Sequence, residues 1–250
     1  DMIKAQVGNT DVIELGIPFS DPIADGSIIQ QASYEAILNG ATLNKTFKLM
    51  EEIRNEGITQ PIVFMLYYNT IVNVGLETFV ERCHKAGVDG LIIPDLPYEE
   101  QEELQEILDR DERTILIQLI SPVTGKRMDK ILGKAKGFVY CVSSMGVTGQ
   151  SGDFHKEIIN YLSSVKEKSP VPVMMGFGIR TAEDVRPMKE VIDGAIVGSH
   201  FIQLMRENNF KIKTATEYTK KFKTELNERQ VQIYDKRSYT ENSNERGFNL

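Results

Sequence analysis

Short runs of apolar, mostly β-branched residues alternate with amphipathic helical patterns through most of this 250-residue chain. Seven of these runs are expected to be strands, at residues 11–16, 61–67, 89–94, 114–119, 138–143, 171–175 and 194–198. Each run is nearly continuous in apolar residues, as is typical of strands that are covered on both faces. Because a helical pattern separates successive strands, the sequence predicts an α/β fold with a parallel sheet.

A closed (β/α)8 barrel has eight strands, whereas the sequence shows seven. The chain starts at Asp1 without an initiator methionine, and residues 2–5 have the pattern of the last turns of a helix. We therefore expect a TIM barrel whose first strand is missing through N-terminal truncation. An open doubly wound sheet is the alternative, but its phosphate-binding glycines would follow the first strand, and none follows residue 16. Glycines close the late strands instead, which favours the barrel.

The barrel is expected to span residues 1–207, followed by one helix within 208–228 and a polar, disordered tail at 229–250.

The net charge of -7 argues against non-specific binding to nucleic acid. No apolar run approaches the ~20 residues that a membrane-spanning helix needs. Cys83 and Cys141 have neither metal-ligand spacing nor a disulfide-rich context. These features predict a cytoplasmic protein with no membrane association and no metal site.

One carboxylate, Glu14, lies within an apolar strand, and Asp21 and Asp25 lie on the loop that follows it. Removing a carboxylate from water is costly, so Glu14 is expected to hold its proton more tightly than a loop aspartate. When two carboxyl groups lie in different environments, one can act as an acid and the other as a base. Structural alternatives stay open, since Glu14 could be an ion-pair partner, Asp25 a helix cap and Asp21 a turn residue. In a barrel, these acids share one face with the late glycines.

Glycines follow the last two strands, where they let a ligand approach the backbone. Gly178 follows one strand, and Gly198-Ser199 closes the next and opens a helix. Helix N-termini favour anions, and barrels build phosphate sites from their last two strand–helix loops. Tight turns, and Ser199 as a simple N-cap, are the structural alternatives. A third glycine-rich loop, residues 144–152, predicts either a mobile lid that places Thr148 over a substrate or a surface loop.

The thirteen residues 14–26, Glu-Leu-Gly-Ile-Pro-Phe-Ser-Asp-Pro-Ile-Ala-Asp-Gly, closely resemble a signature of the tryptophan synthase alpha chain family. Five shorter motifs follow in that family's order: Tyr67-Tyr68-Asn69, Pro94-Asp95-Leu96-Pro97, Gly146-Val147-Thr148-Gly149, Gly176-Phe177-Gly178-Ile179 and Gly198-Ser199. The resemblance covers residues 1–207. It implies a carbon–carbon lyase of tryptophan biosynthesis that cleaves indole-3-glycerol phosphate to indole and glyceraldehyde 3-phosphate by a retro-aldol route. No metal or organic cofactor is implied for this chain.

The resemblance also implies roles for individual residues. Glu14 would be the acid/base that protonates the indole ring carbon and serves the side-chain hydroxyl, while Asp25 would hydrogen-bond the indole N–H. The remaining substrate-binding positions would be Tyr140, Thr148, Gly149, Gly178, Gly198 and Ser199.

The implied partner is the beta chain, which depends on pyridoxal phosphate (PLP) and receives indole in an alpha2-beta2 heterotetramer. PLP would belong to that partner only. The positions implied near the interface are Pro18, Asp21, Asn69 and Pro97, so loop control or contact becomes the expected role of Asp21. Two alternatives stay open: a non-catalytic barrel that activates a partner chain, and another phosphosugar-processing barrel such as indole-3-glycerol-phosphate synthase. Retention of Glu14 together with Asp25 favours an active lyase.

Overall fold

The computed structural model describes residues 1–111, 113–142, 152–176 and 178–227. Its strands are β1 (Ile13–Gly16), β2 (Ile62–Met65), β3 (Gly90–Ile92), β4 (Ile115–Leu116), β5 (Gln118–Ile120), β6 (Val139–Val142), β7 (Val173–Gly176) and β8 (Gly194–Ile196). Its α-helices are α1 (Ser27–Leu38), α2 (Leu43–Asn55), α3 (Tyr68–Val74), α4 (Leu76–Ala86), α5 (Glu102–Leu108), α6 (Met128–Leu132), α7 (Gly152–Lys168), α8 (Ala182–Val185) and α9 (Ser199–Glu207). A further helical segment covers residues 212–227.

The strands form two four-stranded parallel sheets, in the orders β1-β2-β3-β4 and β5-β6-β7-β8. The expected strand 114–119 supplies both β4 and β5: its first half pairs with β3 and its second half with β6. Ile117, between the two halves, still donates its N–H to Leu91 of β3 at 2.9 Å. One chain segment therefore joins the two sheets into a continuous curved wall.

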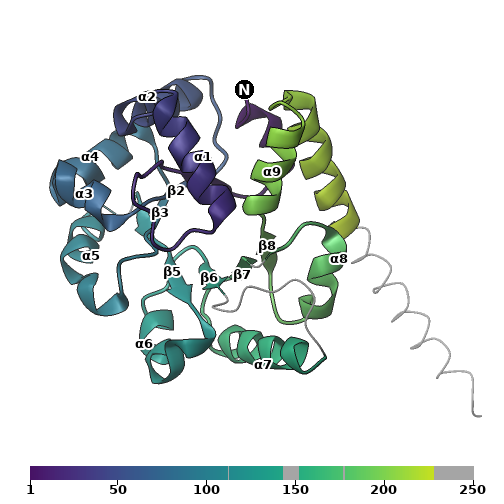
Figure 1. Ribbon diagram of the computed structural model, residues 1–250. Coiled ribbons are helices and arrows are strands. Elements are labelled where there is room, and N and C mark those ends of the chain that lie inside the picture. The colour runs from purple at the N-terminus through teal and green to yellow at the C-terminus, as the bar shows by residue number, and fades with distance from the viewer. Residues whose placement is uncertain (112, 143–151, 177, 228–250) are drawn as a thin grey trace, which may run out of the picture.

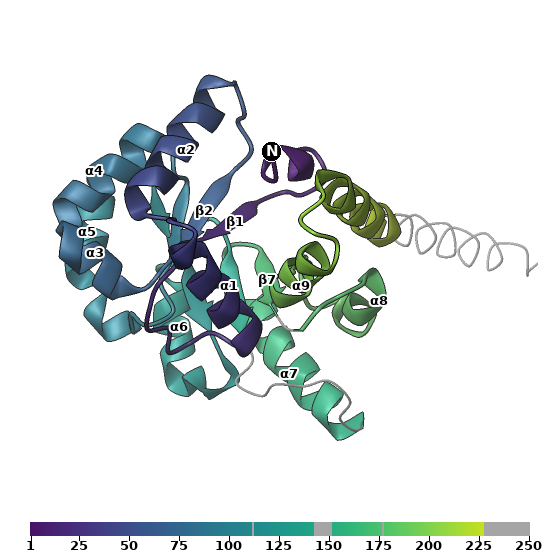
Figure 2. The same ribbon diagram turned by 45° about the horizontal axis from the view of Figure 1, so that its top comes forward.

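The helices surround this wall of strands, as Figure 1 shows. The arrangement is the TIM-barrel fold, and each of the seven expected strands is present in it. In the part of the chain that the structure describes, no strand pairs with the outer edges of β1 and β8. The segment 212–227 lies beside α9 in both views (Figure 2), and Lys223 Nζ donates to Asp11 Oδ1 at 2.6 Å.

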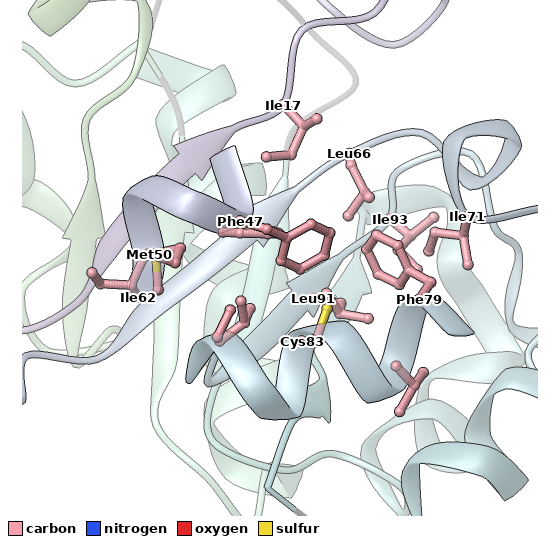
Figure 3. Packing of buried hydrophobic residues seen from close by; sticks show 14 of the residues in the cluster. Ile17, Phe47, Met50, Ile62, Leu66, Ile71, Phe79, Cys83, Leu91 and Ile93 are labelled. Atoms are coloured by element: carbon pink, nitrogen blue, oxygen red, sulfur yellow. The ribbon is translucent and has the colours of Figure 1, made fainter. Parts of the chain in front are cut away.

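Side chains alternate along the strands between the helices outside and the barrel interior inside. On the outer face of β2, Phe64 packs with Phe47 of α2 and Phe79 of α4, with ring centroids 5.7 Å apart in both pairs that include Phe47. Figure 3 shows this layer, in which Met50 and Cys83 fill the space between helices and strands. The inner face carries a separate cluster: Val12, Val63, Met65, Ile92, Ile115, Ile117, Leu119, Phe138, Tyr140, Met174 and Ile196.

Several helical segments differ from the sequence-based expectation. Helix α3 was not expected, because its seven residues are too few to show a helical period. Three expected helices, 98–109, 126–134 and 181–190, each consist of a 3-10 turn joined to a shorter α-helix. The expected helix within 208–228 is observed, whereas the tail at 229–250 lies outside the described residues. None of the helices that the structure describes has the length and apolar character needed to cross a membrane.

Candidate active site

The alternation along β1 directs Glu14 into the barrel. Ile13 and Ile17 pack outward against the helices, while Glu14 lies on the opposite face of the strand. Glu14 also lines a cavity of about 670 Å³ together with Asp25 and Tyr67, and much of the remaining wall comes from residues 1–6 and from helices α1 and α2. The strand therefore places a carboxylate at a hollow of the size that small-molecule ligands occupy.

Two effects raise the pKa of Glu14 from its ordinary value of 4.5 to about 7. Desolvation by the surrounding barrel wall is the larger effect, and the negative charge of Asp25 is the second. The side chain keeps accessible surface because it borders the cavity. Near neutral pH, Glu14 is present in both protonation states, so it can donate a proton and also accept one.

Asp25 reaches the same cavity from the loop after β1, and Tyr67 holds it there. Tyr67 Oη donates to Asp25 Oδ2 at 2.8 Å and accepts from the Ala24 N–H at 2.9 Å. The Tyr67 ring also stacks on Phe19, with centroids 5.1 Å apart and planes 25° apart. Burial first, and then the hydrogen bond and charge of Asp25, raise the pKa of Tyr67, so its hydroxyl stays a donor. The sequence motifs include Tyr67, but they gave no indication of this contact.

Tyr140 of β6, a substrate-binding position implied by the family resemblance, lies on the interior face of the barrel. Burial, followed by the charges of Glu14 and Asp25, raises its pKa well above that of a free phenol. The ring lies against Gly176 of the neighbouring strand: a β-carbon at Gly176 would lie 2.5 Å from Cε1 and 2.6 Å from Oη of Tyr140. The absence of a side chain at Gly176 therefore gives Tyr140 its position, a role that sequence reasoning missed.

The late glycines lie at adjacent strand ends, because β7 and β8 are parallel neighbours. Gly178 follows β7 with a φ of +59°, a conformation that L-residues with a side chain rarely adopt. Gly198 is the N-cap of α9, and Ser199 is its first residue. The two loops therefore follow neighbouring strands on the same side of the sheet. Thr148 and Gly149 lie outside the described residues.

The four positions expected at a partner interface lie on loops or helices that follow three neighbouring strands. Pro18 and Asp21 follow β1, Asn69 is in α3 after β2, and Pro97 follows β3. Asp21, Asn69 and Pro97 are exposed, while Pro18 is half-buried and lines the cavity. Because parallel strands end on the same side, these positions share the face of the barrel that carries the site.

Among the described residues, no group of three or more His, Cys, Asp and Glu side chains is arranged to hold a metal ion. Cys83 and Cys141 are buried and free. The fold and the site define a TIM-barrel protein with an inward-facing glutamate that exchanges protons near neutral pH, beside an aspartate held by a tyrosine hydroxyl.

Comparison with known proteins gives the family. The model of the tryptophan synthase alpha chain family matches residues 2–231, and the chain belongs to this family. The tryptophan synthase alpha chain of Lachnospira eligens is 55% identical over 227 residues, which cover 90% of this chain and 86% of that protein. The corresponding chain of Shouchella clausii is 43% identical over 201 residues, covering 80% and 74%.

Solved structures agree with this assignment. The chain is similar to one in a structure titled as the tryptophan synthase a2b2 complex of Pyrococcus furiosus, with a TM-score of 0.79, 37% identity and 90% coverage of both chains. It is also similar to the tryptophan synthase alpha subunit of Legionella pneumophila, with a TM-score of 0.81, 29% identity and coverage of 91% and 86%. Family membership favours the lyase over another phosphosugar-processing barrel.

Proposed function

We propose that this chain is an alpha subunit that cleaves indole-3-glycerol phosphate to indole and glyceraldehyde 3-phosphate. The observation that carries the proposal is the pair formed by Glu14, with a pKa of about 7, and Asp25 at one cavity. Retro-aldol cleavage needs a group that gives a proton to one carbon and takes a proton from a hydroxyl. A pKa near the working pH suits both tasks.

In the proposed reaction, protonated Glu14 first gives its proton to the indole ring carbon that bears the side chain. The positive charge that develops on the indole nitrogen is stabilised by the Asp25 carboxylate, which accepts a hydrogen bond from the N–H. Glu14, now ionised, removes the proton of the adjacent hydroxyl. The carbon–carbon bond breaks, its electron pair neutralises the indole ring, and the hydroxyl carbon becomes the aldehyde. Glu14 ends in the protonation state in which it began.

Substrate binding is assigned to the late glycine loops and to Tyr140. Gly178, Gly198 and Ser199 hold the phosphate, with Gly149 and Thr148 completing the site from the loop after β6. The adjacency of the β7 and β8 loops and the start of α9 at Ser199 support this phosphate site. Tyr140 presents its hydroxyl to the substrate, supported by its position on the interior face.

The proposed partner is a beta chain in an alpha2-beta2 complex, which holds the PLP and receives the indole. Pro18, Asp21, Asn69 and Pro97 are assigned to this interface, because they lie on the face of the barrel that carries the site. The similarity to a chain of the tryptophan synthase a2b2 complex of Pyrococcus furiosus supports the assembly. We place the protein in the cytoplasm, a location that suits a biosynthetic family and the free cysteines.

Glu14→Gln tests the proposal, because glutamine keeps the shape of the side chain but does not exchange a proton. We expect indole release to fall roughly a hundredfold or more while indole-3-glycerol phosphate still binds. Glu106→Gln, an exposed carboxylate of α5, is the matched control and should leave turnover unchanged. Unchanged turnover in Glu14→Gln would overturn the mechanism and favour a non-catalytic barrel that activates its partner.

A further inference from the structure

Tyr67 occupies the N-cap position of α3 but does not cap that helix. Its backbone is extended, with a φ of -82° and a ψ of 143°, and its side chain makes no capping hydrogen bond. N-cap residues are usually Ser, Thr, Asp or Asn, whose side-chain oxygen accepts from the first N–H groups of the helix. A phenol hydroxyl lies too far from its own backbone for this task. The side chain of Tyr67 is therefore available for contacts elsewhere.

Asp95 supplies the missing acceptor from a different loop. Its two carboxylate oxygens accept from the Tyr68 N–H at 2.9 and 3.1 Å. Asp95 follows β3, so the first turn of α3 is held by the loop of the neighbouring strand. A carboxylate is favourable at this place because the N-terminus of a helix carries partial positive charge. The backbone that carries Tyr67 is thereby fixed from outside its own helix.

The side chain fixed in this way makes three contacts to the loop after β1. Its hydroxyl bridges the Ala24 N–H and the Asp25 carboxylate, and its ring stacks on Phe19. Tyr67 itself is 5% exposed, so the ring has little freedom to turn away. Donation to Oδ2 leaves the other oxygen of Asp25 free to accept a further hydrogen bond.

We propose that Tyr67 is the positioning residue of Asp25 and that Asp95 acts through Tyr67 by fixing the start of α3. The inference rests on the proposed function, because it assumes that Asp25 accepts the indole N–H. The Tyr67 hydroxyl donates one hydrogen bond to the Asp25 carboxylate and accepts another from the N–H of Ala24, the residue before Asp25. Loss of the hydroxyl lets the carboxylate rotate away from the geometry in which it stabilises the developing charge.

Tyr67→Phe tests the proposal directly, because it removes the hydroxyl and keeps the ring on Phe19. In the complete alpha–beta complex, we expect kcat for indole release to fall about tenfold and KM to change less than about twofold, as for one hydrogen bond to a charged group. When Tyr67→Phe is added to Asp25→Asn, we expect kcat to fall by less than about a further twofold, because the residue through which Tyr67 acts is already altered. Sensitive detection of indole by fluorescence makes the slow variants measurable.

Tyr161→Phe is the matched control. Tyr161 Oη donates to the Ile120 carbonyl at 2.7 Å on the outer side of the barrel. Its loss removes a tyrosine hydrogen bond of similar length without touching the cavity. We expect Tyr161→Phe to lower the melting temperature and to leave kcat unchanged, whereas Tyr67→Phe is expected to lower kcat.

Two Asp95 variants test the second half of the proposal. Asp95→Ala should lower kcat in the otherwise unchanged protein and add nothing to Tyr67→Phe, whereas Asp95→Asn should restore most of the activity because its amide oxygen still accepts from Tyr68. An unchanged kcat in Tyr67→Phe, or a full additional loss in the Asp25→Asn background, would overturn the inference. If Asp25→Asn itself keeps full turnover, the proposed function fails instead.

Discussion

The Tyr140 ring lies in the space that a β-carbon at Gly176 would occupy. The two residues belong to β6 and β7, which are parallel neighbours, and both face the barrel interior. Ring atoms and hydroxyl would come within 2.5 to 2.6 Å of such a carbon, a distance that real structures do not show. The position of the Tyr140 ring on the interior face of the barrel therefore depends on the absence of a side chain one strand away.

Gly176→Ala is expected to displace Tyr140 and to disturb the pocket. Overpacking of this kind costs about 1–3 kcal/mol in the free energy of unfolding, and the displaced ring should raise KM for indole-3-glycerol phosphate. Urea denaturation and steady-state kinetics measure the two effects. Gly26→Ala is the control for stability, because a β-carbon there meets nothing within 4 Å and its φ of -74° suits alanine. Equal stability of Gly176→Ala and the unchanged protein would contradict the argument.

The raised pKa of Glu14 predicts a pH-dependent cost to stability. Below pH 4.5 the carboxyl group is protonated in the folded and unfolded chain; between 4.5 and about 7 only the unfolded chain releases the proton; above about 7 both have released it. The favourable contribution of Glu14 is therefore complete below pH 4.5 and is lost as the pH rises through 7. Relative to Glu14→Gln, the protein should lose on the order of 1 kcal/mol across this window, since water in the cavity screens part of the effect.

Denaturation of both proteins on either side of the window measures this difference. Glutamine does not titrate in this range. The other carboxylates are the same in both proteins, so their contributions cancel in the difference between the two curves of stability against pH. A stability difference that stays constant with pH would show that Glu14 has an ordinary pKa in the folded chain, and one that changes in the opposite direction would show that this pKa is lowered.

Asp25→Asn should lower the pKa of Glu14 only part of the way from about 7 towards 4.5. The substitution removes the second cause of the shift, the negative charge of Asp25, and leaves desolvation, the larger cause, in place. Titration of carboxyl-labelled glutamate by NMR measures this pKa, with Glu14→Gln identifying the signal. A return to the ordinary value would mean that Asp25, and not burial, is the dominant cause.

The sequence predicted the strands and a desolvated Glu14, because a nearly continuous apolar run, and a carboxylate within one, can be recognised within a single strand. It did not predict the division of the segment 114–119 into β4 and β5, which depends on the neighbour with which each half pairs. Helix α3 was also missed: its seven residues are too few to show a helical period, and the acceptor at its start is Asp95, 27 positions further along the chain from Tyr68.

The roles of Tyr67 and Gly176 were hidden for the same reason. The Tyr67–Asp25 hydrogen bond joins residues 42 positions apart, and the contact between Gly176 and Tyr140 joins two strands. Patterns along one element carry no information about which side chains meet across a cavity. The acids of the site were therefore predictable from the sequence, whereas the groups that hold them in position were not.

Asp21→Ala is expected to weaken binding of the beta chain and to leave substrate binding by the isolated chain unchanged. Asp21 is exposed on the loop after β1, and its carboxylate accepts from the neighbouring Ser20 hydroxyl, so its removal leaves the fold intact. An exposed charge at an interface of this kind is expected to be worth about tenfold in the dissociation constant. Titration calorimetry with the beta chain measures the change. Glu106→Ala removes an equally exposed carboxylate from α5, outside the proposed interface, and should have no effect. If both variants bind the beta chain as tightly as the unchanged protein does, Asp21 does not belong to the interface.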